Sequence, residues 1–219
     1  MFLPKKTNMN PSELDQLCAV AAGLHDRGYA FGSTGSLSLR ADDYVWITPT
    51  DKPLSGLTTA QLACLAPDGR SLNRNAPPND SAVHLAIYRC RPDVNAAIHL
   101  YSNYAVAVSC LERLDPVQPL PILTPQYLMS VVPLAVIPYF PLGSEQLAEA
   151  VATEAQTHQC LLLRNQGSMC MGSTLSEALN RAEVLEANAR LFFLLRDLPV
   201  HTLDGEARNH APAANQDAR

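Results

Sequence analysis

The sequence has no closely spaced pair of cysteines, so the CxxC spacing of zinc ribbons and redox motifs is absent. Several of its cysteines stand in apolar runs such as VSCL and HQCLLL, where a thiol packs as a small hydrophobic group. We therefore expect buried, reduced thiols rather than disulfides. The six cysteines are Cys18, Cys64, Cys90, Cys110, Cys160 and Cys170.

Long apolar runs are missing as well. No segment reaches about 18 apolar residues, which is the shortest run that reads as a membrane-spanning helix. The first residues, MFLPKKTNMNPSELDQ, are too polar for a secretory signal. We expect a cytoplasmic chain without a membrane partner.

Positive charge is also scarce. The net charge is −5 and the pI is about 5.6, and lysine and arginine form no dense cluster, which argues against nucleic acid as a partner. The glycine-rich GSTGS segment has neither the Walker lysine nor the full GxGxxG spacing. Neither a nucleic-acid-binding protein nor a nucleotide-binding loop is indicated.

The remaining composition is that of an ordinary globular protein, with 47% hydrophobic and 17% charged residues. No internal repeat or linker divides the 219 residues, which are enough for one domain with a substantial core. We expect an arm over 1–10, one domain over 11–204 and a frayed, polar tail over 205–219.

Hydrophobic periodicity predicts helices that alternate with strands. Helical spacing runs through 10–27, 79–91, 103–112, 144–158 and 174–198, and Thr58 and Thr59 offer a further helix start. Strands are predicted near 36–40, 44–49, 94–101 and 159–164, and the apolar run VVPLAVIPYF is a further candidate. Together with an early antiparallel hairpin, this alternation predicts an α/β fold: a three-layer α/β/α arrangement with a mixed, mainly antiparallel sheet.

The stretch VNAAIHLYSNYAVAVS, residues 94–109, is the first candidate for a site. An apolar strand delivers His99 to the start of a polar turn, and Tyr101 follows two residues later. Side chains two apart in a strand share a face. Because strand ends that open into a turn and a helix often carry sites in α/β proteins, we expect His99 and Tyr101 to face a site together.

Four stretches resemble a known family in their order and spacing. They are RGYAFGSTGSLSLR, WITPTDKPLSGLT, HLAIYRCRPDVNAAIHLYSNYAVAVSCL and LLLRNQGSMCMGSTLSEALNRAEVLEANARL. Together they resemble the class II aldolase/adducin family over about residues 12–204, most closely its 3-oxo-tetronate 4-phosphate decarboxylase branch. The resemblance implies the same three-layer fold and carbon–carbon lyase chemistry.

The resemblance also implies a metal site, from which this chain departs. Family enzymes hold zinc or another divalent ion with a His-x-His pair and an Asn-His-Gly histidine, beside a glutamate four residues before a helix histidine. The matching positions here are His99, Tyr101, Gln166 and, four residues before His84, Asp80. A phenol must lose its proton to bind metal well, and an amide carbonyl is a poor zinc ligand. We expect at most a weak zinc or manganese site at His99.

The positions that match the family's phosphate pocket have changed too. They are Ser36, Thr50 with Asp51, and Pro78 with Asn79. Asp51 would repel a phosphate dianion unless a cation such as Lys52 offsets its charge. Pro78 brings neither a hydroxyl nor an N–H donor. A neutral or cationic ligand is therefore favoured over a phosphorylated sugar.

Three functions remain open from these residues. In the first, the chain is a divergent lyase that cleaves or decarboxylates a small hydroxy or keto acid or a sugar-derived substrate. Asp80, His99 and Tyr101 would then exchange protons. Its substrate-binding set would be Ser36, Thr50, Asp51, Asn79, Asn165 and Gln166. In the second, it is a non-catalytic family member that acts as a binding or partner subunit, where His99 simply closes a strand and Asp80 favours a helix N-terminus.

A different small-molecule activity in a remodelled pocket is a third reading, in which Asp80 and Asp51 orient a hydroxylated or cationic substrate. The resemblance further implies a homotetramer whose sites lie between neighbouring subunits. The apolar, proline-rich segment 116–143 is the expected source of part of that interface. Tyr127 and Tyr139 are the candidates for reaching a neighbouring site, and the alternative for each is simple packing within its own subunit, which is the more frequent case for a tyrosine.

Overall fold

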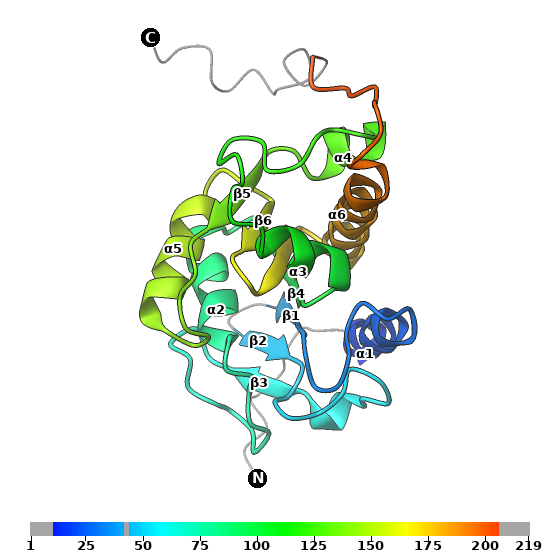
Figure 1. The fold of residues 1–219 in the computed structure, drawn as a ribbon. Coiled ribbons are helices and arrows are strands. Elements are labelled where there is room, and N and C mark those ends of the chain that lie inside the picture. The colour runs from blue at the N-terminus through cyan, green and yellow to red at the C-terminus, as the bar shows by residue number, and fades with distance from the viewer. Residues whose placement is uncertain (1–10, 42–43, 206–219) are drawn as a thin grey trace.

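A computed structural model of the chain describes residues 11–41 and 44–205. The expected arm over 1–10 lies outside the described residues, as does the expected tail beyond Gly205. Figure 1 shows a central sheet with helices on both of its faces, which confirms the predicted three-layer α/β/α architecture.

Within the described residues, the sheet has seven strands in the order β3-β2-β1-β4-β7-β6-β5. Neighbouring strands are antiparallel except for the parallel pair β5–β6 at one edge, so the sheet is mixed and mainly antiparallel, as predicted. The strands are β1 (Ser36–Ala41), β2 (Tyr44–Ile47), β3 (Ala63–Leu65), β4 (Ala96–Leu100), β5 (Leu134–Ile137), β6 (Cys160–Leu163) and β7 (Gly167–Gly172).

Helices cover the sheet in two layers, each built over its own hydrophobic cluster. Two of them, α2 (Ser81–Cys90) and α5 (Glu145–Ala155), pack on one face. The other face carries α1 (Pro11–Asp26), α3 (Asn103–Ser109), α4 (Pro125–Ser130) and α6 (Leu175–Leu195). The hydroxyls of Ser144 and Thr174 accept backbone N–H bonds at the starts of α5 and α6, which fixes where these helices begin.

The structure differs from the local predictions at several places, among them β3, which was not predicted. The helix expected after Thr58 is one 3-10 turn, Thr59–Gln61, and the chain then enters β3. Neither β7 nor α4 was predicted. All six cysteines are free, but Cys110 is exposed because α3 ends one residue before it.

The middle of the sheet is where the candidate site begins. All five residues of β4 are buried, because β4 lies between β1 and β7 and contributes to both hydrophobic clusters. The turn after it is held by Glu186 of α6, whose carboxylate accepts bonds from the Ser102 hydroxyl at 2.7 Å and the Ala105 N–H at 2.8 Å. The end of β4 that carries His99 is therefore held by the neighbouring strands β1 and β7 and also by the bonds from the following turn to α6.

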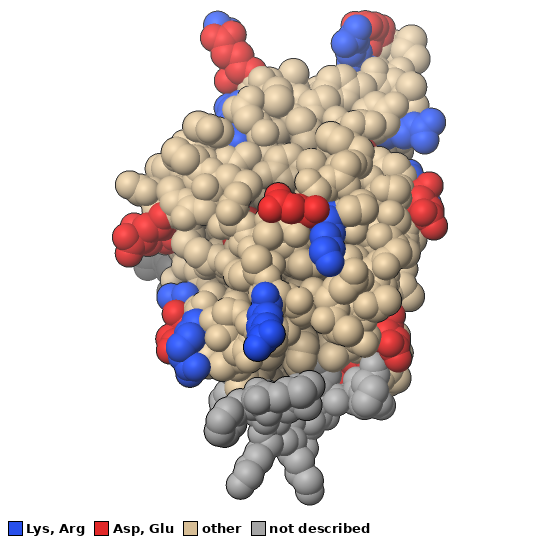
Figure 2. Space-filling model, turned by 90° about the horizontal axis from the view of Figure 1, so that it is seen from below, with Lys and Arg blue, Asp and Glu red and all other residues tan. Residues whose placement is uncertain are grey.

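Little on the surface suggests a binding site for a polyanionic macromolecule such as nucleic acid. On the face shown in Figure 2, charged side chains of both signs are scattered over a largely uncharged area. None of the helices in the described part of the chain combines the length and the apolar character required to cross a membrane.

Candidate functional site

His99 lies at the centre of the site, near the end of β4, and its ring is fully buried. Its Nδ1 is 2.6 Å from Oδ2 of Asp80, and its Nε2 is 2.9 Å from the backbone carbonyl oxygen of Gln166. A carbonyl oxygen only accepts, so Nε2 carries a proton and donates it. Both ring nitrogens are therefore engaged by the protein itself.

Asp80 occupies the N-cap position of α2, but its side chain makes no capping bond to that helix. It points instead at the site, where Oδ2 accepts a 2.6 Å bond from the Ser36 hydroxyl as well as facing His99. The bonds that the described residues make to this carboxylate all fall on Oδ2. That leaves Oδ1 as the oxygen that can meet a substrate.

Two opposing effects set the protonation of Asp80. Burial raises the pKa of its carboxyl, but the hydrogen bonds and positive charge that His84 and His99 supply outweigh burial and hold the pKa well below its usual value. Asp80 is thus ionised at neutral pH, and its buried charge lies beside His99.

Tyr101 follows β4 and lies against His99, with the two ring centroids 4.8 Å apart. Burial, then the charges of Asp80 and Tyr139, raise the pKa of the Tyr101 phenol to about 12. The phenol therefore keeps its proton at neutral pH and can donate a hydrogen bond. The expected meeting of His99 and Tyr101 is present.

Gln166 reaches the site through the tight turn between β6 and β7. Asn165 and Gly167 in this turn have positive φ, and a Cβ at Gly167 would overlap the backbone oxygen of Leu100. The side-chain amide of Gln166 donates to the carbonyl oxygen of Phe140 at 2.6 Å. Its Oε1 is buried and has no partner among the described residues.

The structure brings only part of the predicted set together. Ser36, Asp80, His99, Tyr101 and Gln166 meet around the end of β4.

The other four predicted positions lie at the margin. The Thr50 backbone N–H donates to the carbonyl oxygen of Ala76, and Asp51 and Asn79 are exposed. The Asn165 side chain contacts Cys110. None of these four side chains has a described contact with the five that meet, so their substrate-binding role stays a prediction.

Three residues that the sequence did not single out as functional complete the site. The His84 Nε2 is 2.8 Å from the Ser36 hydroxyl, and its Nδ1 is 2.7 Å from the Ser38 hydroxyl, which is in turn 2.7 Å from the Tyr88 hydroxyl. Asp80, His84 and Tyr88 are spaced by four residues along one face of α2. That spacing of polar groups on a buried helix was the signal that could have found His84 and Tyr88.

The residues at the family's metal positions do not fit a divalent ion as they stand. Both nitrogens of His99 are occupied, the raised pKa of Tyr101 disfavours the phenolate form, and the Gln166 side chain offers one neutral carbonyl oxygen. Within residues 11–41 and 44–205, no three His, Cys, Asp or Glu side chains gather as a metal-binding group.

Comparison with known proteins gives relatives that span almost the whole chain. The chain is 37% identical over 198 residues to a 3-oxo-tetronate 4-phosphate decarboxylase from Haemophilus influenzae, covering 90% of this chain and 93% of that protein. It is 33% identical over 190 residues to an L-fuculose phosphate aldolase from Methanococcus maripaludis, covering 87% and 99%.

Its fold matches the crystal structure of YgbL from Escherichia coli with a TM-score of 0.88 at 35% identity, covering 91% of this chain and 97% of that one. The family model described as the class II aldolase and adducin N-terminal domain matches residues 15–193. The chain therefore belongs to the class II aldolase and adducin N-terminal domain family.

Proposed function

We propose that this chain is a carbon–carbon lyase that cleaves or decarboxylates a small hydroxy or keto acid, or a related sugar-derived substrate. Relatives that are at least 33% identical over most of the chain carry the names of a decarboxylase and of an aldolase. These two reactions share a chemical problem, because both leave an enolate that must be stabilised and then protonated.

The observation that carries the proposal is the geometry of Asp80. Asp80 is 5% exposed, and its Oδ2 is hydrogen-bonded to Ser36 and His99. Its Oδ1 has no hydrogen bond to the described residues. A buried carboxylate that is oriented on one oxygen and open on the other is suited to general acid–base work.

Tyr101 and His99 supply the rest of the chemistry. The protonated phenol of Tyr101 donates a hydrogen bond to the oxygen on which negative charge develops. His99 donates a hydrogen bond from Nδ1 to Oδ2 of Asp80 and fixes the carboxylate in place, so that Oδ1 exchanges a proton with the substrate carbon or hydroxyl.

We propose that the part of the substrate that faces Ser36, Thr50 and Asp51, the positions that match the family's phosphate pocket, is uncharged or positively charged. The Ser36 hydroxyl is already committed to Asp80 and His84, and the Thr50 N–H to Ala76. With Asp51 exposed beside them, little remains there to hold a dianion.

Turnover assays test this function. The protein is incubated with 3-oxo-tetronates, with and without a 4-phosphate, and with L-fuculose phosphate, and released carbon dioxide or aldehyde is measured. We expect activity on the unphosphorylated acid, a loss of at least about 100-fold in kcat for Asp80→Asn, and a similar loss for Tyr101→Phe. His158→Asn, three residues past the end of α5 and outside the site, is the matched control. Full activity in Asp80→Asn would refute the proposed role of that carboxylate.

The second candidate is the non-catalytic binding or partner subunit. It is favoured by one observation, that both nitrogens of His99 are bonded to the protein. Saturable binding of a hydroxy or keto acid by calorimetry, with no turnover of any of the compounds above, is the outcome expected for that candidate.

A further inference from the structure

The site continues into the protein as an unbroken chain of buried polar groups, which we call the relay. Its members share two features: each is at most 6% exposed, and each is hydrogen-bonded to the next at 2.6–2.8 Å. In order, they are Tyr88, Ser38, His84, Ser36, Asp80 and His99.

Counting protons fixes the direction of the bonds. The Ser36 hydroxyl has one proton and donates it to Asp80, so it must accept from Nε2–H of His84. A neutral His84 then has a bare Nδ1, to which Ser38 donates, and Tyr88 donates to Ser38. Every bond in this half of the relay points toward Asp80.

The same heavy atoms also accommodate one more proton. If Nδ1 of His84 is protonated, it donates to Ser38, Ser38 donates to the Tyr88 oxygen, and Tyr88 donates to the backbone oxygen of Ser38, which lies 3.1 Å away. Two hydroxyls rotate and no polar atom of the relay loses its partner. Asp80 stabilises the added charge, because its Oδ2 is 3.9 Å from His84 Nε2.

We propose that His84, acting through Ser36, is the internal proton donor and acceptor for the Asp80–His99 pair. In the transfer, the Nε2–H bond of cationic His84 breaks as an O–H bond forms on Ser36, and the original Ser36 O–H bond breaks as its proton binds Asp80. His84 is left neutral with its proton on Nδ1, and the carboxyl is left neutral. The reverse step returns the proton.

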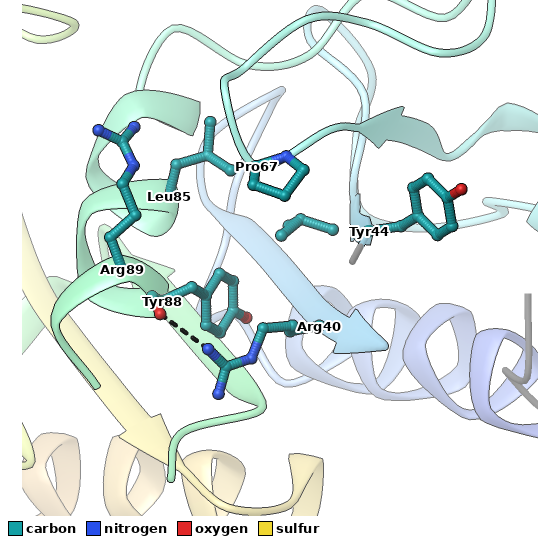
Figure 3. Close-up of a pocket in the computed structure, with 7 residues that line it drawn as sticks. Arg40, Tyr44, Pro67, Leu85, Tyr88 and Arg89 are labelled. Carbon is teal, nitrogen blue, oxygen red and sulfur yellow. Dashed lines mark hydrogen bonds between the residues drawn. The ribbon is translucent and has the colours of Figure 1, made fainter. Parts of the chain in front are cut away.

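The far end of the relay is anchored rather than open. The Arg40 guanidinium donates to the backbone oxygen of Tyr88 at 2.7 Å and lies 5.2 Å from the centroid of its ring (Figure 3). Tyr88 and Arg40 form part of the wall of a pocket of about 260 Å³ that Leu85 and Arg89 of α2 also line. With Tyr88 held in this way, the Ser38 and His84 bonds keep their geometry while protons move.

This inference deepens the proposed function, and its main test does not need turnover. The ring nitrogens and N–H protons of ¹⁵N-histidine-labelled protein are observed by NMR. His84 is expected to carry a slowly exchanging proton on Nε2. Ser36→Ala should shift the Nδ1 signal of His99, which lies two members further along the relay. Ser109→Ala, which removes a hydroxyl that donates to the Val106 carbonyl oxygen on a fully buried residue, should leave both histidines unchanged.

Finding an unprotonated Nε2 on His84, or no change at His99 in Ser36→Ala, would overturn the relay. If Ser36→Ala does not fold, the measurement on the unmodified protein still decides the direction of the bonds. Ser36→Thr keeps the hydroxyl and should restore the parent His99 signal.

When a substrate that the protein turns over has been found, steady-state kinetics of His84→Gln give a second test. His84→Gln is expected to lower kcat about 10- to 100-fold with KM within about twofold, and to raise the solvent deuterium isotope effect. Absence of turnover in the parent and in every variant would refute the proposed function, and the NMR result would still stand. An unchanged isotope effect and kcat in His84→Gln would overturn the proton-transfer role.

Discussion

At the scale of single residues, the buried charge of Asp80 determines how the protein responds to acid. The pKa of this carboxyl in the folded chain lies well below its usual 3.8. A carboxylate with a depressed pKa adds to the free energy of unfolding above its unfolded pKa, and that contribution is lost as pH falls through the folded pKa.

Asp80→Asn should therefore lower the free energy of unfolding by about 3 kcal/mol between pH 5 and 7, because it leaves His99 without its charged partner. Below pH 3.8 the difference from the parent should shrink. Urea unfolding at several pH values measures it. Asp197→Asn, at a side chain that is 85% exposed, should change stability little at any pH. A difference that grows on acidification would contradict this account.

The metal positions give a second prediction at this scale. As purified, the protein should hold well below one equivalent of zinc, since only His99 remains of the three imidazoles that the family uses. The double variant Tyr101→His, Gln166→His should bind zinc tightly and melt at a higher temperature in its presence, because a ligand of the folded state stabilises it.

Metal analysis and melting curves with and without zinc check this result for the parent and the variant. Adding His99→Asn to the variant should abolish the gain. Stoichiometric zinc in the parent protein would show that His99 can leave the Gln166 carbonyl for a metal, and would return the chain to ordinary metal-dependent chemistry.

How far the site could be predicted also depends on single residues. Asp80, His99 and Tyr101 followed from the pattern at one strand end and from the family resemblance. The bonds from His84 to Ser36 and Ser38 did not, because they exist only where β1 lies next to α2, and a sequence does not state which strand a helix covers.

At the scale of elements, the turn between β6 and β7 is the most constrained point near the site. Gly167 has a φ of +81° and approaches the Leu100 backbone too closely for a side chain. Gly28 has a similar φ of +75° but open space around it.

Gly167→Ala should consequently cost at least about 3 kcal/mol of stability, whereas Gly28→Ala should cost only the 1–2 kcal/mol or so of the left-handed backbone. Chemical unfolding of the two variants compares them directly. Equal losses would mean that the approach to β4 is less tight than described.

The elements that were predicted correctly are the ones with a strong local pattern. The helices α1, α2, α3, α5 and α6 and the strands around Leu39, Val45, Ile98 and Leu162 were identified, with boundaries wrong by a few residues. β7 has the sequence GSMCMG, with glycine at both ends and no β-branched residue. Its pairing with β4 and β6 makes it a strand, and this pairing is invisible locally.

At the scale of the whole molecule, exposed apolar side chains point to self-association. Four large ones, Val117, Met129, Tyr139 and Leu142, are 42–82% exposed and fall in the segment 116–143 that was expected to form an interface. Tyr139 is also close enough to raise the pKa of Tyr101. We expect a neighbouring subunit to contact this segment.

We predict a homotetramer of about four times 23.7 kDa in solution. Light scattering at micromolar concentration measures the mass. Met129→Glu should reduce the mass by placing a charge on the apolar surface, while Leu198→Glu, at an apolar residue just past α6, should not. A monomeric parent would contradict the tetramer.

The strand order has a consequence for how the protein is made. Ser36, Asp80, His99 and Gln166 come from four regions of the chain and meet only when β1 and β7 flank β4. Closing such long loops is slow compared with forming helices. During synthesis, the side chains of Asp80, His84 and His99 stay exposed to water until residues 167–172 have emerged from the ribosome. A nascent chain stalled before β7 should therefore have folded helices and no functional site.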